Sequence, residues 1–480
     1  MWMEAGLPAD SHFARLSRSA PPVRVGIVHL GLGAFFRAHG AVYVEEAMSA
    51  SGGDWGILGV SLQSATMRDH LAPQGGTYMA LELGPQGETS RHVQSVQGVL
   101  VAREDPQAVL DAMARPGVRV VSLTVTEKGY CHAPSTGRLN TAHPDIMHDL
   151  DNALPVSAPG YLVRALALRR QRGLVPFTVL SCDNLPNNGH VVRSVVLDLA
   201  RAIDPALADW IEAEGRFPST MVDRIVPATK PEDIARVESL IGARDAGPVM
   251  HEPFRQWVVE DDFVGDLRPD LGAVGVQMVH DVTGYEHMKL RMLNGTHSSL
   301  AYLGYLAGHE TIADCMADPV LDRFVQALWA REIIPALTPP DGVSLAAYAQ
   351  ALHARYANPS IRHRTWQIAM DGSQKLPQRI LGTLESNLAA GRPSPSLMLA
   401  VAAWMIYVRG SDLAGQPIEV KDPLAPALRT AATAPDPVGA LLALREVFPE
   451  PLAAQLDQPV RAAHSALLAQ GAKAAMGSLT

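Results

Sequence analysis

The sequence predicts an α/β domain built on a parallel sheet, followed by a mostly α-helical domain. Before about residue 280, short apolar runs rich in β-branched residues alternate with helical patterns, which indicates a parallel sheet covered on both faces. After that point, long helical stretches rich in Ala, Leu and Met take over, separated by Pro and Gly. The 480 residues also exceed what one hydrophobic core usually serves. We therefore predict one domain over residues 1–279 and a second over 280–480.

The elements of the first domain follow from the spacing of its apolar residues. VGIVHL at 25–30 predicts a strand, two glycines after it predict a turn, and apolar residues at helical spacing over 38–51 predict a helix. GILGVSL at 56–62 predicts the next strand, and this order of elements is how dinucleotide-binding folds begin. Further strands are expected at 118–126, 177–181 and 274–279, with a helix at 160–171.

The second domain is expected to consist of helices bounded by Pro and Gly. Its longest apolar run, LMLAVAAWMIYV at 397–408, has twelve residues, whereas crossing a bilayer takes roughly 20. This run is therefore expected to be a buried helix rather than a membrane span. The other expected helices are 285–306, 319–337, 345–356 and 438–447.

Composition and charge narrow the classes of partner. The chain is 47% hydrophobic and 19% charged, so it is expected to pack a core. With 40 Lys and Arg against 49 Asp and Glu it carries a net charge of −9, and it has no basic block. This balance argues against nucleic acid and against an anionic membrane surface as partners. We expect a small-molecule ligand, and a monomer or small homo-oligomer.

The cysteines and the first 24 residues indicate in which cellular compartment the protein is expected. Cys131, Cys182 and Cys315 are widely spaced, without a CxxC pair or a neighbouring histidine motif, so neither a disulfide framework nor a zinc site is predicted. The first 24 residues contain no apolar run of the kind that directs secretion. We therefore expect a cytoplasmic protein without a metal.

A glycine turn suggests where a nucleotide would bind. Gly31 and Gly33 follow the first strand, where one glycine permits a tight turn and the next lets the backbone approach a pyrophosphate at a helix start. The third fingerprint position is Phe36 rather than Gly or Ala, so a plain turn between strand and helix remains the alternative. No carboxylate stands at 63–66 to bind a ribose hydroxyl, and Arg68 lies nearby, so these residues leave NAD and NADP both open.

The segment EHMKLRMLNGTH at 286–297 holds the strongest catalytic candidates. At about 100° per residue, Lys289, Asn294 and His297 fall within roughly 140° of one helix face. A lysine desolvated in a cleft suits a general base for an alcohol, and an asparagine amide suits the oxygen on which charge develops. The alternative is an amphipathic helix with a solvated lysine.

These and other segments resemble the polyol-specific long-chain dehydrogenases, the mannitol dehydrogenase family. Within it the chain is most similar to the fructuronate reductases, also called D-mannonate oxidoreductases. The resemblance implies an NAD-binding Rossmann-type domain, a helical C-terminal domain and no metal. The matching segments span most of the chain: IVHLGLGAFFRAH at 27–39, SLTVTEKGYC at 122–131, SCDN at 181–184, FPSTMVDRIVP at 217–227, EPFRQWVVED at 252–261, KLRMLNGTHS at 289–298 and HRTWQIAMDGSQKLPQR at 363–379.

The resemblance also implies roles for individual residues. Lys289 would be the general base, and Asn184 and Asn294 would polarise the carbonyl oxygen. His297 would hydrogen-bond a substrate hydroxyl, and Glu286 would gate proton exit to solvent. For Asn184 the alternative is a turn residue, because Leu-Pro follows it.

The remaining implied contacts concern the cofactor and the rest of the substrate. Asp223 would contact the sugar chain, with pairing to Arg224 or capping of a turn as the alternative, and Lys375 is placed in the substrate site. The cofactor-binding residues are Gly31, Gly33, Ala34 and Phe35. Where this chain has Phe36 the family pattern has histidine, which leaves open how the turn packs.

The substrate is expected to carry a carboxylate. Mannitol-type members tend to have an arginine eight residues before the lysine equivalent to Lys375, whereas this chain has Gln367, as in the uronate-reducing branch. A carboxylate needs a cation, ideally a bidentate arginine. Most of the candidates are expected to be surface charges, with only Lys375 in the site; they are Arg362, His363, Arg364, Lys375 and Arg379.

The sequence thus predicts an NAD-dependent enzyme that interconverts D-fructuronate and D-mannonate in a cleft between its domains. The first alternative is a mannitol- or arabitol-type polyol 2-dehydrogenase that acts on an uncharged ketose. The second is a dinucleotide-binding sensor without catalysis, against which Lys289, Asn294 and His297 argue. A metal-dependent alcohol dehydrogenase is disfavoured because no ligands cluster in the sequence.

Overall fold

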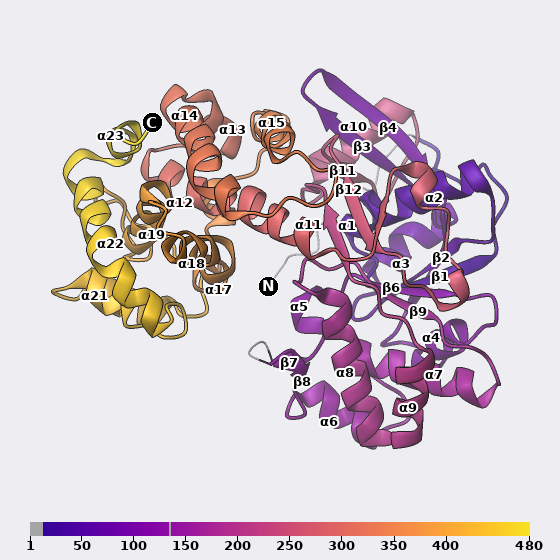
Figure 1. Ribbon diagram of the computed structural model, residues 1–480. Helices are drawn as coiled ribbons and strands as arrows, with labels where there is room; N and C mark the ends of the chain where they lie inside the picture. Colours follow the sequence, from indigo (N-terminus) through magenta and orange to yellow (C-terminus); the bar gives the residue numbers. More distant parts are fainter. Residues whose placement is uncertain (1–12, 134–135) are drawn as a thin grey trace. The chain divides into compact units, whose positions relative to one another are not determined.

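The computed structural model describes residues 13–133 and 136–480 (Figure 1). The first twelve residues, which are half of the 24-residue N-terminal stretch without an apolar run, lie outside the described part. The chain divides into two compact units, Met1–Thr283 and Gly284–Thr480, where we predicted a division between residues 279 and 280. Across the described ranges, no helix is both long and apolar enough to cross a membrane.

A five-stranded parallel sheet forms the centre of the first unit. Its strands, in spatial order, are β5 (Val96–Val101), β2 (Gly56–Ser61), β1 (Val25–Leu30), β6 (Val120–Leu123) and β9 (Thr178–Ser181). All four neighbouring pairs are parallel. Every side chain of β6 and β9 is buried, because separate apolar clusters pack on the two faces of the sheet.

Helices cover this sheet as the alternation of patterns predicts. On one face, α7 (Ala158–Gln171), α8 (Asn188–Ile203) and α9 (Pro205–Glu214) pack together (Figure 1). The other face receives α2 (Gly40–Ser51), whose Val42, Tyr43 and Val44 are buried. Ser157 begins α7, where its hydroxyl accepts the N–H of Gly160 at 3.0 Å.

One predicted strand belongs to a different sheet. Of the run at 274–279, only β13 (Gln277–Val279) is a strand, and it pairs in parallel with β12 (Gln256–Glu260). Strand β10 (Thr220–Asp223) pairs with β12 on its other side in the antiparallel sense. The expectation that 274–279 joins the parallel sheet is therefore wrong. Its place is taken by β5, a strand that the sequence analysis did not identify.

Residues 78–93 and 249–251 form a third, small sheet. Strands β3 (Tyr78–Gly84) and β4 (Gly87–Val93) form an antiparallel hairpin, and β11 (Val249–His251) pairs in parallel with β3. The first four residues of β3 and Leu83 are buried, whereas the first five residues of β4 are exposed. The exposed, polar face of β4 explains why periodicity did not reveal this hairpin.

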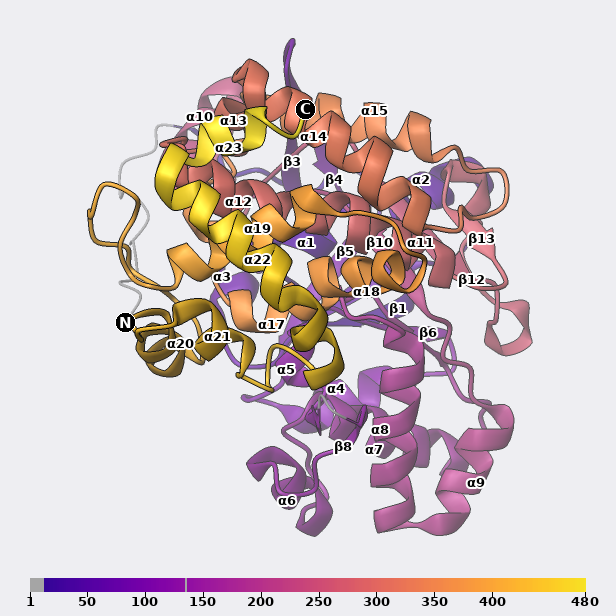
Figure 2. The same cartoon turned by 60° about the vertical axis from the view of Figure 1, so that its left-hand side comes forward.

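The second unit is helical, as predicted. Its most buried helix is α19 (Pro395–Tyr407), in which every residue after Pro395 is buried. The long α22 (Glu450–Gln470) packs along α19 (Figure 2). Helix α15 (Leu345–Tyr356) has the predicted bounds, while α21 (Pro437–Leu442) ends five residues before the predicted 447.

Two of the predicted long helices are interrupted by π-helical segments. The run at 285–306 consists of α11 (Thr283–Met288), the π-helix η4 (Lys289–Gly295) and α12 (Thr296–Leu306). The run at 319–337 consists of α14 (Pro319–Leu328), the π-helix η5 (Trp329–Ile333) and the short 3₁₀ helix η6 (Ile334–Ala336). Such segments are rare and frequently occur at functional sites.

Candidate active site

The glycine turn leaves the central strand β1 at the carboxyl edge of the sheet. Gly31 has a φ of +90°, and a Cβ built there would lie 2.2 Å from the carbonyl oxygen of Thr124, so this position requires glycine. The Gly31 N–H donates to the Val60 carbonyl at 2.8 Å, and its own carbonyl accepts the Thr124 hydroxyl at 2.7 Å. At Gly33 a Cβ would meet only the Gly31 carbonyl oxygen, at 3.8 Å. The turn is thus fixed by neighbouring strands, with open space beside its second glycine.

A short helix, α1 (Ala34–Ala38), follows the turn directly. Gly33 is its N-cap and has no side chain to cap the first turn. The N–H groups of the first turn, including those of Ala34 and Phe35, are donors that a helix start presents to a phosphate. Of the four residues predicted to bind the cofactor, Gly31 and Gly33 therefore lie in the turn, and Ala34 and Phe35 begin the helix that follows it.

Phe36, which stands where the family pattern has histidine, closes the packing beside the turn. Its ring stacks on His29, with ring centroids 3.3 Å apart and an interplanar angle of 7°. His29 Nδ1 lies 2.8 Å from the Ser122 hydroxyl, and Nε2 lies 2.9 Å from the Thr124 hydroxyl. Burial lowers the pKa of His29 to about 3, so the ring is neutral.

The loop after the second predicted strand bears on the choice of cofactor. Strand β2 ends at Ser61, and Arg68 follows on α3 (Thr66–Leu71). The Arg68 guanidinium pairs with the carboxylate of Asp69 at 2.8 Å and with that of Glu104. Arg68, the cation that could favour a 2′-phosphate, is therefore paired with two carboxylates.

Asn184 and Asp223 lie on neighbouring parts of the first unit. The loop that carries Asn184 is anchored by Asp183, whose carboxylate accepts the N–H groups of Val125 and Thr126, both at 2.9 Å. Asn184 itself is exposed on this loop. Asp223 is buried as the last residue of β10. The hydroxyl of Thr220, on the same strand, donates to the Ser181 carbonyl at 2.6 Å and so joins β10 to the end of β9.

Lys289 and Asn294 lie in the π-helix η4, and His297 follows in the first turn of α12. All three are buried, with 8%, 8% and 5% of their surface exposed, and Glu286 is half-buried on α11. A π-helix closes i→i+5 hydrogen bonds. The spacing of 100° per residue that put these residues on one face does not hold from 289 to 295, and that argument is wrong. Their burial in the second unit contradicts the alternative of a solvated lysine.

The candidate cations of the second unit separate into two kinds. Arg362 and Arg364 are ion-paired with Glu310, at 3.7 and 3.3 Å, as expected of surface charges. Lys375 is half-buried and donates from Nζ to the carbonyl oxygens of Met370 and Ile368, at 2.5 and 3.3 Å.

His363 and Arg379 do not fit the expectation of surface charges. Burial, followed by the charges of Lys375 and Arg379, lowers the pKa of His363 to about 4. The His363 ring lies edge-on to His297, with centroids 5.2 Å apart. Burial also lowers the pKa of Arg379. For these two residues the expectation is therefore wrong.

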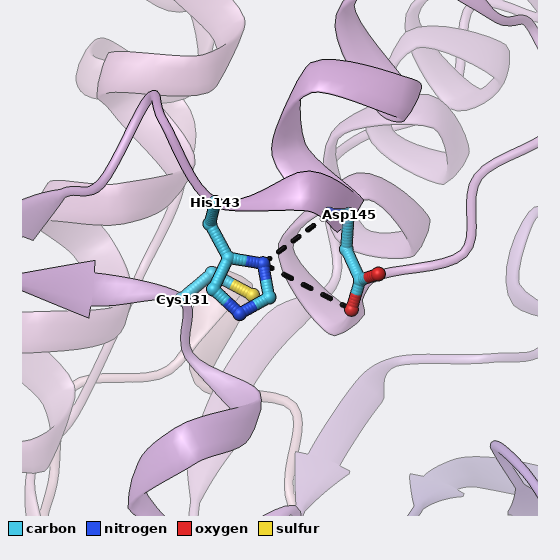
Figure 3. Close-up of side chains that lie close together, drawn as sticks. All are labelled: Cys131, His143 and Asp145. Carbon is cyan, nitrogen blue, oxygen red and sulfur yellow. Dashed lines mark hydrogen bonds and ion pairs between the residues drawn. The ribbon is translucent and has the colours of Figure 1, made fainter.

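The first unit also gathers a cysteine, a histidine and an acid that are separated in the sequence. Ligand atoms of Cys131, His143 and Asp145 lie within 4.8 Å of one another (Figure 3), although their spacing predicts no such group. His143 is the N-cap of α6 (Pro144–Asp151), and its Nδ1 accepts the N–H of Asp145 at 3.3 Å. Burial raises the pKa of the Cys131 thiol to about 12. His143 Nδ1 thus caps the start of α6, and this hydrogen bond to the backbone is the contact that fixes its ring.

Comparison with known proteins defines the class of this one. The family model of the mannitol dehydrogenase Rossmann domain matches residues 25–272, and that of the mannitol dehydrogenase C-terminal domain matches residues 281–467. The protein is therefore an oxidoreductase built from two dehydrogenase domains. It belongs to the mannitol dehydrogenase family, and the predicted fold class is confirmed.

Relatives with different substrates in their names resemble the chain over most of its length. It is 47% identical to the D-mannonate oxidoreductase of Escherichia coli, covering 94% of this chain and 95% of that protein. It is 42% identical to the mannitol 2-dehydrogenase of Pyricularia oryzae, covering 86% and 84%. The solved structure of Pseudomonas fluorescens mannitol 2-dehydrogenase, a ternary complex with NAD and D-mannitol, superimposes with a TM-score of 0.86 at 37% identity, covering 98% and 97%.

Proposed function

We propose that the protein is an NAD-dependent oxidoreductase that interconverts D-fructuronate and D-mannonate. The observation that carries the proposal is the burial of Lys289 and Asn294 in one π-helix of a chain that belongs to this family. The likeness to a D-mannonate oxidoreductase and the glutamine at position 367 favour the sugar acid over the uncharged sugar.

The glycine turn fits a dinucleotide such as the NAD of the Pseudomonas enzyme. The space beside Gly33 admits a phosphate that a Cβ would obstruct, and the uncapped first turn of α1 supplies N–H donors. The pairing of Arg68 with Asp69 and Glu104 favours NAD over NADP, because both acids would repel a 2′-phosphate.

In the proposed reaction, each residue handles a proton or a developing charge. During oxidation Lys289 accepts the proton of the carbinol hydroxyl, and during reduction it returns a proton to the carbonyl oxygen. The side-chain amides of Asn294 and Asn184 donate hydrogen bonds to that oxygen, and charge builds up on it in the transition state. His297 and Asp223 hold other hydroxyls of the sugar chain. NAD, when bound, supplies the acceptor or donor of the hydride.

The experiment is a comparison of substrates with the purified protein. NADH oxidation is followed by absorbance with D-fructuronate, and with D-fructose under identical conditions. We expect fast oxidation with fructuronate and slow oxidation with fructose. Faster turnover of fructose would instead establish the polyol 2-dehydrogenase alternative, which the likeness to the mannitol 2-dehydrogenases favours. Binding of NADH without turnover of any polyol or hexuronate would identify a sensor.

A further inference from the structure

The second unit contains a group of basic side chains that we call the Arg379 cluster: His297, His363, Lys375 and Arg379. The rings of His297 and His363 are 5.2 Å apart. Burial is the largest cause of the lowered pKa of both histidines. The charges of Lys375 and Arg379 add to it at His363, and those of His363, Arg355 and Arg379 add to it at His297. The histidines are therefore neutral, and the positive charge of the cluster resides on Lys375 and Arg379.

Arg379 lies directly against the helix that carries the proposed base. It belongs to the π-helix η7 (Pro377–Leu381), which packs on η4. The approach is close enough to require glycine, since a Cβ at Gly295 would lie 2.6 Å from the Arg379 carbonyl oxygen. The guanidinium Nη1 donates to the hydroxyl of Ser298 at 3.3 Å. Arg379 thus contacts Gly295 and Ser298, which follow the predicted site residues Asn294 and His297 in the sequence.

The charge of Arg379 has no acidic partner among the described residues. A guanidinium has five N–H donors, and the Ser298 hydroxyl is the one acceptor that faces it in the described part of the chain. The hydroxyls of Tyr302 and Tyr356 partly offset the lowering of its pKa by burial. By contrast, Arg362 and Arg364 share the carboxylate of Glu310.

Arg379 is half-buried, and a positive charge partly removed from water is stabilised when an anion pairs with it. Lys375 is less available for that role, because two of its three donors are bonded to backbone carbonyls. His363 Nδ1, by contrast, is buried without a hydrogen-bond partner in the described part of the chain. It supplies a neutral donor when it carries the ring proton.

We propose that Arg379 binds the carboxylate of the sugar acid and sets the preference of the enzyme for acids over uncharged ketoses. The inference rests on the proposed function and adds the residue that recognises the acid. The planar guanidinium matches both oxygens of a carboxylate, and an uncharged ketose has no group that makes this pair of bonds. His363 and Lys375 complete the anion site as a neutral donor and a second positive charge.

Two substitutions and a matched control test the assignment. Arg379→Gln removes the charge, and Arg379→Lys keeps it without the bidentate geometry. Arg362→Gln is the control, because it removes a nearby exposed arginine that is paired with Glu310. For each variant we measure kcat and KM with D-fructuronate and with D-fructose, the binding of D-mannonate by calorimetry, and the thermal unfolding midpoint.

We expect Arg379→Gln to raise the KM for fructuronate by about 30-fold or more, as expected for one partner of a desolvated charge pair. The KM for fructose should change less than about twofold. Arg379→Lys should raise the fructuronate KM by a smaller factor, and Arg362→Gln should leave it unchanged. If Arg379→Gln does not fold, the ratio of the two KM values in Arg379→Lys decides the question.

Failure of this inference is distinct from failure of the proposed function. If the wild-type protein prefers fructuronate and Arg379→Gln affects both substrates equally, the function stands and the role of Arg379 is refuted. If the wild-type protein prefers fructose, the proposed function is refuted. Calorimetry then decides on Arg379: D-mannonate that binds wild type and not Arg379→Gln supports the anion site, and equal binding by both overturns it.

Discussion

Two alanine substitutions in the glycine turn are expected to separate folding from cofactor binding. At Gly31 the φ of +90° costs a residue with a Cβ about 1–3 kcal/mol. The Cβ would also lie 2.2 Å from the Thr124 carbonyl oxygen, so the backbone must shift by about 1 Å, which costs another 1–3 kcal/mol or so. Gly31→Ala should therefore lower the free energy of unfolding by about 4 kcal/mol. Gly33→Ala should leave it nearly unchanged, since φ is −87° and the nearest atom is 3.8 Å away.

Gly33→Ala, which should keep its stability, is the variant that should lose affinity for the cofactor. The methyl group of Gly33→Ala occupies the space that we assign to the pyrophosphate, and we expect NADH to bind at least about tenfold more weakly, or 1.4 kcal/mol. Thermal unfolding measures the stability, and a titration of NADH fluorescence measures the affinity. Wild-type affinity in a folded Gly33→Ala protein would refute the placement of the cofactor at this turn.

Four further predictions concern the base, the metal, the pH and a helix cap. Lys289→Ala should lose turnover by about a thousandfold while NADH affinity is kept, and near wild-type rates at neutral pH would refute the base. Activity should survive dialysis against a chelator, and loss restored by added zinc would revive a metal-dependent mechanism. Burial lowers the folded-state pKa of three histidines, His29, His39 and His251, to about 3, and nearby arginine charges add to the effect at His39 and His251. An unfolded histidine titrates near 6.5, so the contribution of these neutral rings to stability is complete above that pH and is lost as the pH falls toward 3. The loss at pH 5 is about 2 kcal/mol for each histidine. A thermal unfolding midpoint that stays constant from pH 7 to pH 5 would contradict this. The Glu332 carboxylate accepts two N–H groups at the start of α19, at 2.8 and 2.9 Å. Glu332→Ala should therefore lower the free energy of unfolding, measured by chemical denaturation, by about 3 kcal/mol, and Glu332→Gln should lower it by less.

The spacing of apolar residues predicted an element correctly where the residues that pack together are also close in the sequence. The strand β1, the turn at Gly31 and the helix α2 follow one another along the chain, so apolar spacing and two glycines were sufficient to predict them. The buried helix α19 was also predicted, because twelve successive apolar residues have no other place in a folded chain.

The spacing of apolar residues did not predict elements whose position depends on segments far away in the sequence. Strand β13 is placed by its pairing with β12, and β5 by its pairing with β2, and apolar runs carry no information on such pairings. The π-helix η4 changes the angular spacing of Lys289 and Asn294 without a Pro or other local signal, because tertiary packing against η7 holds it in place.

The sequence by itself determined the fold class, the family and the chemical types of the candidate residues, because these depend on composition, on periodicity along the chain and on the wording of its motifs. Only the tertiary structure decided which charges are paired. Arg362 and Arg379 are equivalent in the sequence as basic residues of one segment, yet the first pairs with Glu310, and the second is half-buried and donates to Ser298. The physical reason is that the free energy of a charge depends on its distance to other charges and on its exclusion from water, and both are set by residues far away along the chain.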